Sequence, residues 1–302
     1  VKGSLQSDVT HVYTAQRAFA ALKSDGSVIT WGDPNYGGDS AAVKGSLQSD
    51  VTNIYLTNWA FAAVKSDGSV ITWGGPSYGG DSATVEGSLQ NAVMRIYSTA
   101  GDFAAVKSDG SVITWGYLNG GGDSAMEKGS LQRDVTNIYS TNAAFAALKN
   151  DCSVITWGDP NNGGDSAAVK GSLQSDVANI FSTQGAFAAL KSDGSVITWG
   201  DPYYGGDSAA VKDSLQSDVT CIYLTKGAFA ALKSDGSVIT WGDPNYGGDS
   251  AAVKGSLQSD VTHIYSTRWG TMFTSGAFAA VKGDGSVITW GNPAGDSSAV
   301  SL

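Results

Sequence analysis

The chain has 302 residues, of which 41% are hydrophobic and 40 are glycine, and its formal net charge is -10. That charge opposes the phosphate attraction on which nucleic-acid binding depends, and no basic run offsets it, so we exclude DNA and RNA as partners. No stretch approaches the roughly 20 apolar residues of a membrane helix, so we expect no membrane insertion. All but two of the 28 acidic residues are aspartate, which favours turns over helices.

The phrase Ser-Val-Ile-Thr-Trp-Gly occurs seven times and ends on Trp-Gly pairs that are mostly 42 residues apart. Tandem copies of this length indicate one repetitive domain over residues 1–302. The repeats span 1–42, 43–84, 85–126, 127–168, 169–210, 211–252 and 253–302.

Each repeat contains three short β-rich runs, which in the sixth repeat are 218–223, 228–233 and 237–242. The second and third runs are joined by Ser-Asp-Gly, which suits a tight hairpin in which Gly236 adopts a positive φ. Residues 243–250 predict a long turn, and residues 251–259 predict a loop with a brief helical turn.

Three strands cannot bury both faces of a small sheet, so neighbouring repeats must stack. The sequence therefore predicts an all-β fold, a seven-bladed β-propeller with about three antiparallel strands per blade. Recurring Phe229 and Trp241 would fill the gaps between blades. An open β-solenoid is the alternative, but it would need polar end caps, whereas here we expect Val1 to resume the pattern after residue 302.

Ala231-Leu232-x-x-Asp235-Gly236-x-Val238-x-x-Trp241-Gly242, followed by Gly247, resembles the signature of the regulator of chromosome condensation repeat family. The resemblance recurs in all seven repeats, and the compact repeat is more similar to the secreted bacterial propeller inhibitors of β-lactamase than to the longer eukaryotic repeats. It implies a seven-bladed propeller with binding roles. It does not imply guanine-nucleotide exchange, because no residues match the exchange wedge, and the chain departs from the family pattern at Ala228, Pro244 and Gly248.

Two segments vary from repeat to repeat: the link between the first and second runs, and the turn after the tryptophan. Both should lie at the same end of an antiparallel blade and form one variable face. The last repeat adds seven residues, 268–274, to its link. Tyrosine, tryptophan, arginine and amides in such segments are typical of recognition surfaces. The candidate binding residues are Arg17, Tyr36, Trp59, Tyr78, Arg268, Trp269, Met272 and Phe273. Neutral drift of exposed loops is the alternative.

No metal site, cofactor or catalytic centre is predicted. His11 and His263 share one repeat position, with Cys221 one blade away, but no third ligand or carboxylate converges on them. The aspartates of the repeated Gly-Asp-Ser turns offer too few oxygens for Ca²⁺ and suit Asx turns instead; they are Asp39, Asp81, Asp123, Asp165, Asp207, Asp249 and Asp296. The chain contains no nucleophile elbow, phosphate-binding loop, zinc-protease helix or dinucleotide fingerprint, so we expect that it is not an enzyme.

These features predict a non-catalytic propeller scaffold that binds a protein partner through its variable face. A lectin-like carbohydrate-binding propeller and a structural subunit of a large assembly are the alternatives. The variable residues differ from blade to blade, which favours one composite protein site over repeated sugar pockets. The compartment remains undetermined.

Overall fold

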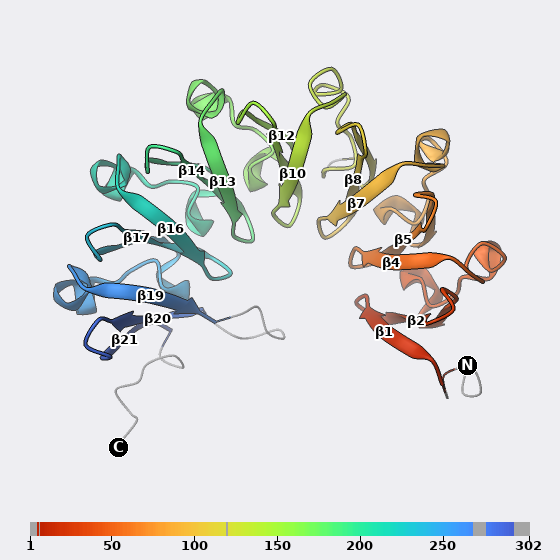
Figure 1. Cartoon of the computed structure of the whole chain (residues 1–302), viewed down its shortest axis with the longest axis horizontal. Helices are drawn as coiled ribbons and strands as arrows, with labels where there is room; N and C mark the ends of the chain where they lie inside the picture. Colours follow the sequence, from red (N-terminus) through yellow and green to blue (C-terminus); the bar gives the residue numbers. More distant parts are fainter. Residues whose placement is uncertain (1–4, 6, 119, 268–275, 293–302) are drawn as a thin grey trace. The chain divides into compact units, whose positions relative to one another are not determined.

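The computed structural model describes residues 5, 7–118, 120–267 and 276–292, which form seven three-stranded sheets, one for each repeat (Figure 1). The first strands are β1 (Val9–Thr14), β4 (Val51–Leu56), β7 (Val93–Ser98), β10 (Val135–Ser140), β13 (Val177–Ser182), β16 (Val219–Leu224) and β19 (Val261–Ser266). The second strands are β2 (Ala18–Lys23), β5 (Ala60–Lys65), β8 (Asp102–Lys107), β11 (Ala144–Lys149), β14 (Ala186–Lys191), β17 (Ala228–Lys233) and β20 (Ala277–Lys282). The third strands are β3 (Val28–Gly32), β6 (Val70–Gly74), β9 (Val112–Gly116), β12 (Val154–Gly158), β15 (Val196–Gly200), β18 (Val238–Gly242) and β21 (Val287–Gly291).

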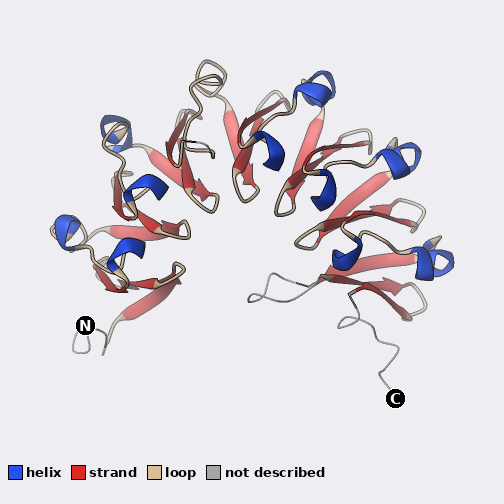
Figure 2. Cartoon of the chain, turned by 180° about the vertical axis from the view of Figure 1, so that it is seen from behind, coloured by secondary structure: helices blue, strands red, loops and turns tan. Residues whose placement is uncertain are grey.

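Sequential strands pair antiparallel, so each sheet is one blade, and the prediction of an all-β, seven-bladed propeller with three strands per blade is confirmed. Short 3₁₀ segments lie in the connections between consecutive blades (Figure 2). These segments are η1 (Pro34–Tyr36), η2 (Ala41–Val43), η3 (Pro76–Tyr78), η4 (Glu86–Leu89), η5 (Pro160–Asn162), η6 (Ala167–Leu173), η7 (Pro202–Tyr204), η8 (Ala209–Leu215), η9 (Pro244–Tyr246) and η10 (Ala251–Leu257). The helical turn predicted within 251–259 is therefore present.

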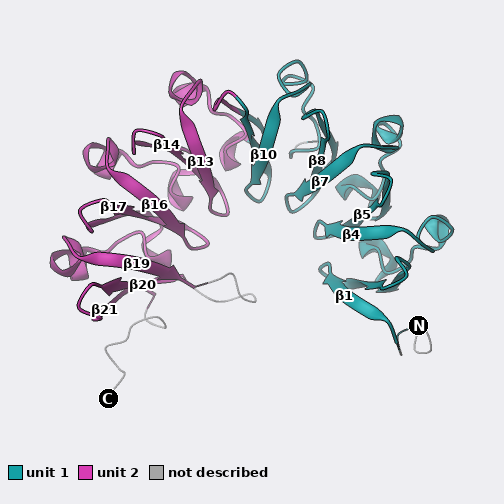
Figure 3. Cartoon of the chain, in the orientation of Figure 1, with its two compact units in different colours: residues 1–150, 155–159 teal, residues 151–154, 160–302 magenta. Residues whose placement is uncertain are grey.

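The chain divides into two compact units (Figure 3). Unit 1 comprises residues 1–150 and 155–159 and holds blades one to three and most of blade four. Unit 2 comprises residues 151–154 and 160–302 and holds blades five to seven. A single domain over residues 1–302 stays a prediction.

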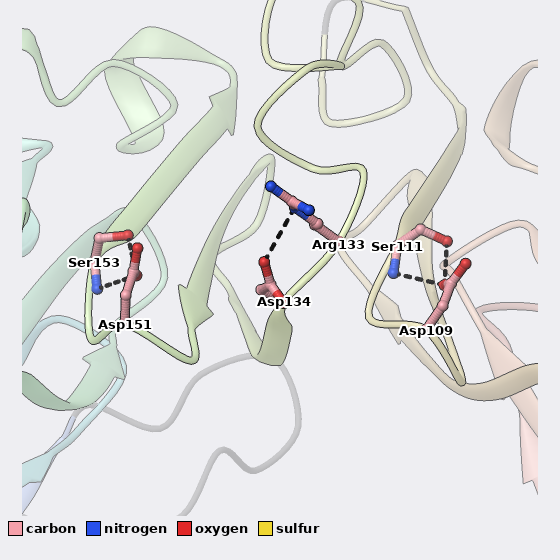
Figure 4. A network of polar contacts seen from close by, with 6 residues as sticks. All are labelled: Asp109, Ser111, Arg133, Asp134, Asp151 and Ser153. Atoms are coloured by element: carbon pink, nitrogen blue, oxygen red, sulfur yellow. Dashed lines mark hydrogen bonds and ion pairs between the residues drawn. The ribbon is translucent and has the colours of Figure 1, made fainter.

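The predicted hairpin between second and third strands is confirmed by its turn geometry. In the sixth blade Gly236 has φ 77° and its N–H donates to the carbonyl of Lys233. The aspartate before the glycine closes the turn, because one carboxylate oxygen accepts from the backbone N–H and the hydroxyl of the following serine. Figure 4 shows this arrangement for Asp109 with Ser111 and for Asp151 with Ser153.

The blades within a unit pack through a repeated tryptophan and phenylalanine pair. In blade two Phe61 is fully buried and stacks on Trp73, with 5.2 Å between ring centroids. Trp73 Nε1 donates to the carbonyl of Gly37 in the preceding blade at 3.1 Å. A Cβ at Gly37 would come within 2.6 Å of the Phe61 ring, so only glycine allows this contact. The same bond joins Trp115 to Gly79 in unit 1, and Trp241 to Gly205 in unit 2.

Both cysteines, Cys152 and Cys221, are free thiols. Cys152 lies in the fourth blade's hairpin at the position that glycine occupies in the other blades, and its φ is 61°. The prediction that this position has a left-handed backbone is therefore correct.

Candidate binding face

The two variable segments of each blade meet at one end of the sheet, as predicted. The backbone N–H of Asp33, which begins the turn after β3, donates to the carbonyl of Arg17 in the link before β2 at 2.9 Å. The equivalent bond in blade two runs from Gly75 to Trp59 at 2.8 Å. Residues of both segments therefore share one end of the blade.

The links of neighbouring blades in unit 1 are also bonded to one another. Gln16 N donates to the Asn58 carbonyl, Asn58 N donates to the Ala100 carbonyl, and Ala100 N donates to the Asn142 carbonyl, at 2.9–3.1 Å. This chain of backbone bonds fixes the spacing of the side chains that the links carry.

Four aromatic side chains from these segments form a stacked row that we call the aromatic row: Tyr36, Trp59, Tyr78 and Tyr117. The ring centroids are separated by 6.5 Å, 4.3 Å and 5.8 Å in that order. The Arg17 guanidinium lies over the Tyr36 ring at 5.3 Å and extends the row by one cation–π contact. The closest pair, Trp59 and Tyr78, is in face-to-face van der Waals contact, an arrangement worth about 0.5–1.5 kcal/mol beyond the burial of apolar area.

A buried hydroxyl holds the centre of the row in place. Thr57, which is 2% exposed, accepts hydrogen bonds from the backbone N–H groups of Trp59 and Ala60. The same hydroxyl donates to the carbonyl of Tyr78 at 3.0 Å. The link that carries Trp59 and the turn that carries Tyr78 are therefore fastened to each other.

The turn of blade two is shaped to admit the large indole. Gly75 stands where the first blade has Asp33, and a Cβ on Gly75 would lie 3.2 Å from Trp59 Cβ. The Asn35 carbonyl lies at the same distance from that Cβ. A side chain at position 75 would therefore be tightly packed against the Trp59 link.

Blade three carries a pair of linked replacements. In blade one the carboxylate of Asp33 accepts from Asn35 N and stabilises the turn, but Tyr117 replaces that aspartate in blade three. Asp102 there replaces the alanine that begins the second strand, and its Oδ2 accepts from Gly121 N at 2.8 Å. The turn keeps a carboxylate acceptor, which now comes from another strand, and the Tyr117 ring stacks on Tyr78 in the row.

Asp102 is 1% exposed, and burial raises the pKa of its carboxyl above the usual range. Hydrogen bonds from the Thr99 hydroxyl and the Gly121 N–H oppose that shift, since they favour the charged form. Its Oδ1 has no hydrogen-bond partner within the described part of the chain. The turn that presents Tyr117 is thus organised around a carboxylate that is costly to bury.

A cleft of about 500 Å³ lies along the row, lined by Arg17, Asp33, Tyr36, Trp59, Pro76 and Tyr78 among others. A second, smaller depression of about 280 Å³ shares Pro76 and Ser77 with it and is also lined by Asp81, Thr84 and Leu118. Because they share Pro76 and Ser77, the two depressions lie next to each other in unit 1.

Unit 2 has tyrosines in its turns but no comparable row among its described residues. Gly185 and Gly227 stand at the position of Trp59, and a Cβ at either would lie 2.9–3.0 Å from the ring of Tyr204 or Tyr246. These tyrosine rings therefore cover the links where unit 1 has its indole. Lys226 lies 5.9 Å from the centroid of Tyr246.

Four of the candidate binding residues are thus brought together by the structure: Arg17, Tyr36, Trp59 and Tyr78. Arg268, Trp269, Met272 and Phe273 lie outside the described residues. Sequence comparison of the repeats had placed Tyr117 and Asp102 in variable segments without including them in the site. Two departures from the repeat in the same blade point to them: Tyr117 replaces the turn aspartate, and Asp102 adds an aspartate at the start of the second strand.

The turn aspartates behave as Asx residues, as predicted. Asp39 Oδ1 accepts from Ala41 N at 2.8 Å, and Asp81, Asp123, Asp165, Asp207 and Asp249 make the equivalent bond. Asp296 lies outside the described residues. No group of three or more His, Cys, Asp and Glu side chains suited to a metal occurs in the described part of the chain.

His11 and His263 are both exposed, and His263 Nδ1 lies 3.2 Å from the Thr262 hydroxyl. Among the residues that the structure describes, none belongs to a helix of the length and apolarity that crossing a membrane requires.

No protein-family model and no curated protein matches the chain. Similar solved structures include Prp20p from Saccharomyces cerevisiae, at 15% identity and TM-score 0.45, covering 80% of this chain and 73% of that one. The ectodomain of the Physcomitrella patens receptor kinase CR4 matches at 14% identity and TM-score 0.46, covering 93% and 72%. The computationally designed Ika8 protein matches at 16% identity and TM-score 0.37, covering 94% and 84%. Likenesses this distant carry no argument about function, and the resemblance to the compact bacterial inhibitors stays a hypothesis.

Proposed function

We propose that this chain is a non-catalytic propeller scaffold that binds a protein partner through the variable face of unit 1. The observation that supports the proposal most strongly is the aromatic row with Arg17 at its end, set in a cleft of about 500 Å³. Tyrosine, tryptophan and arginine are the residues that most often dominate the energy of protein interfaces.

The way the rings are stacked favours a protein over a sugar. A carbohydrate stacks on an exposed ring face, but the Trp59 indole already stacks on Tyr78 at 4.3 Å and on Tyr36 at 6.5 Å between ring centroids. The rings in the middle of the row therefore offer their edges and polar groups to a partner. Those edges suit the mixed apolar and hydrogen-bonding surface of a polypeptide.

A binding role also agrees with how the row is held. The backbone hydrogen bonds between links, and the bond from the Thr57 hydroxyl to the Tyr78 carbonyl, hold the segments that carry the rings in place before a partner binds. Prior ordering lowers the entropy that association costs. Arg17 and Asp33 line the cleft, but its lining residues include no pairing of nucleophile and base that would indicate acyl or phosphoryl transfer.

The proposal is tested by capturing partners from the native source with the intact chain and with Trp59→Ala, beside a glycan array of the same two proteins. We expect a protein retained by the intact chain and lost with Trp59→Ala. Lys65→Ala is the matched control, because Lys65 ends β5 at the opposite end of the blade. Trp59-dependent binding to glycans, with no retained protein, would contradict the proposal.

A further inference from the structure

We infer that the partner presents a proline-rich segment in the polyproline II conformation, with a basic residue at one end, to the two adjoining depressions of unit 1. This inference rests on the proposed function and adds the chemistry of the segment that is bound. Three observations carry it: unpaired donors on the row, the absence of a backbone edge to pair with in the cleft, and the charge of the second depression.

The row offers hydrogen-bond donors that the protein itself does not use. The core tryptophans, such as Trp73, donate Nε1 to a glycine carbonyl, but Trp59 Nε1 has no acceptor within the described residues. The hydroxyls of Tyr36 and Tyr78 likewise have no protein partner in that part of the chain. A matching ligand must supply acceptors at several neighbouring points. A polyproline II segment does so, because its backbone has no internal hydrogen bonds and its carbonyls are free.

A partner cannot bind in the cleft by adding a strand to one of the sheets. The N–H groups of Asp33, Gly75 and Asn58 are already bonded to carbonyls of the links, so backbone pairing with an added strand is not available there. Recognition must instead come from ring edges and the rings of Pro34 and Pro76, which line the cleft. Aromatic grooves of this kind bind proline-rich segments, whose stiffness reduces the entropy lost on binding.

The second depression supplies a charge for one end of the segment. The exposed side chain of Asp81 lines this depression, and its Oδ1 accepts a hydrogen bond from Ala83 N at 2.9 Å. Neighbouring Asp39 and Asp123 at equivalent turn positions are also exposed, and the chain as a whole carries -10. A lysine or arginine that follows the prolines would therefore lie beyond Pro76 and Ser77, where the acidic side chains attract its positive charge.

The test uses fluorescence anisotropy with a labelled synthetic peptide of about twelve residues that carries a Pro-x-x-Pro core and one terminal arginine. Two further peptides replace the prolines by alanine or the arginine by glutamine. We expect the parent peptide to bind the full chain and the alanine peptide to bind at least tenfold more weakly. Trp59→Ala should weaken the parent peptide by about tenfold or more, whereas Lys65→Ala should leave it unchanged. Asp81→Asn should weaken the parent peptide about fivefold and leave the glutamine peptide unchanged.

Equal binding of the proline and alanine peptides, or no dependence on Trp59, would overturn the inference. Loss of binding in Asp81→Asn that is the same for the arginine and glutamine peptides would overturn the part assigned to the basic residue. If a protein partner depends on Trp59 but the proline peptide does not compete with it, the inference fails and the proposed function stands. If no protein partner depends on Trp59, the proposed function itself fails.

Discussion

Replacing Cys152 by glycine should stabilise the protein, because this side chain occupies a backbone conformation that glycine occupies in the other blades. The φ of Cys152 is 61°, and Gly26, Gly110 and Gly194 at the same turn position have φ of 75–79°. A Cβ built on those glycines lies 2.6–2.7 Å from the backbone nitrogen of the residue before the next blade's first strand. Cys152 therefore has a left-handed backbone at a turn position where, in those other blades, a Cβ would be crowded.

The two contributions set the size of the effect. The left-handed conformation costs a residue with a Cβ about 1–2 kcal/mol. Glycine gives back about 0.5–1 kcal/mol through its greater freedom in the unfolded chain. Cys152→Gly should therefore raise the free energy of unfolding by about 1 kcal/mol and the melting temperature by about 2 °C.

The assay is thermal and urea unfolding followed by circular dichroism under reducing conditions. Cys152→Ser is the matched control, since it removes the thiol but keeps the Cβ, and it should show no gain. Gly194→Cys should lower stability by a similar amount, because it places the same side chain in the fifth blade's turn. A lower melting temperature for Cys152→Gly, or an equal gain for Cys152→Ser, would refute the reasoning.

Three further outcomes are expected. Ala92 has φ 64° where the other blades have aspartate, so Ala92→Asp should raise the free energy of unfolding by about 0.5–1 kcal/mol in urea titrations, and an unchanged midpoint would contradict the assignment. Burial raises the pKa of the Asp102 carboxyl in the folded state. The cost of burying this carboxyl is therefore absent below the unfolded pKa and appears as pH rises through the folded pKa. Asp102→Asn should be more stable than the parent near neutral pH, and the difference should shrink toward about pH 4. A gain that grows on acidification would show that the sign is wrong. Chelation by EDTA should leave thermal unfolding unchanged, because the turn carboxylates are already bonded to backbone N–H groups, and a marked loss of stability would revive a calcium site.

The fold could be predicted from the sequence because the same structural motif is repeated seven times. Short β-rich runs, the Ser-Asp-Gly hairpin and the spacing of the tryptophans identify strands, turns and blades without further information. The common end shared by the two variable segments follows from antiparallel pairing alone, and the Asp33 to Arg17 bond agrees with it.

The aromatic row could be predicted only in part. Comparison of the repeats identifies Trp59 as a variable link residue, and Tyr36 and Tyr78 as aromatic residues of the turns. Their stacking depends on distances between blades, which the sequence of a single repeat does not determine. The role of Asp102 was missed because it makes sense only together with a second replacement, the loss of the turn aspartate at Tyr117. Such compensations appear when departures are read in pairs within one blade.

The central claim is that the aromatic row binds the partner and does not merely fill space. The direct measurement is the dissociation constant of the captured partner for the parent chain, Trp59→Ala and Lys65→Ala, each checked for its melting temperature. We expect Trp59→Ala to cost about 2 kcal/mol or more, at least a thirtyfold loss of affinity, with the fold retained, and Lys65→Ala to change the affinity little. Unfolding of Trp59→Ala would identify the indole as packing, and loss of binding in Lys65→Ala alone would place the site on the opposite face.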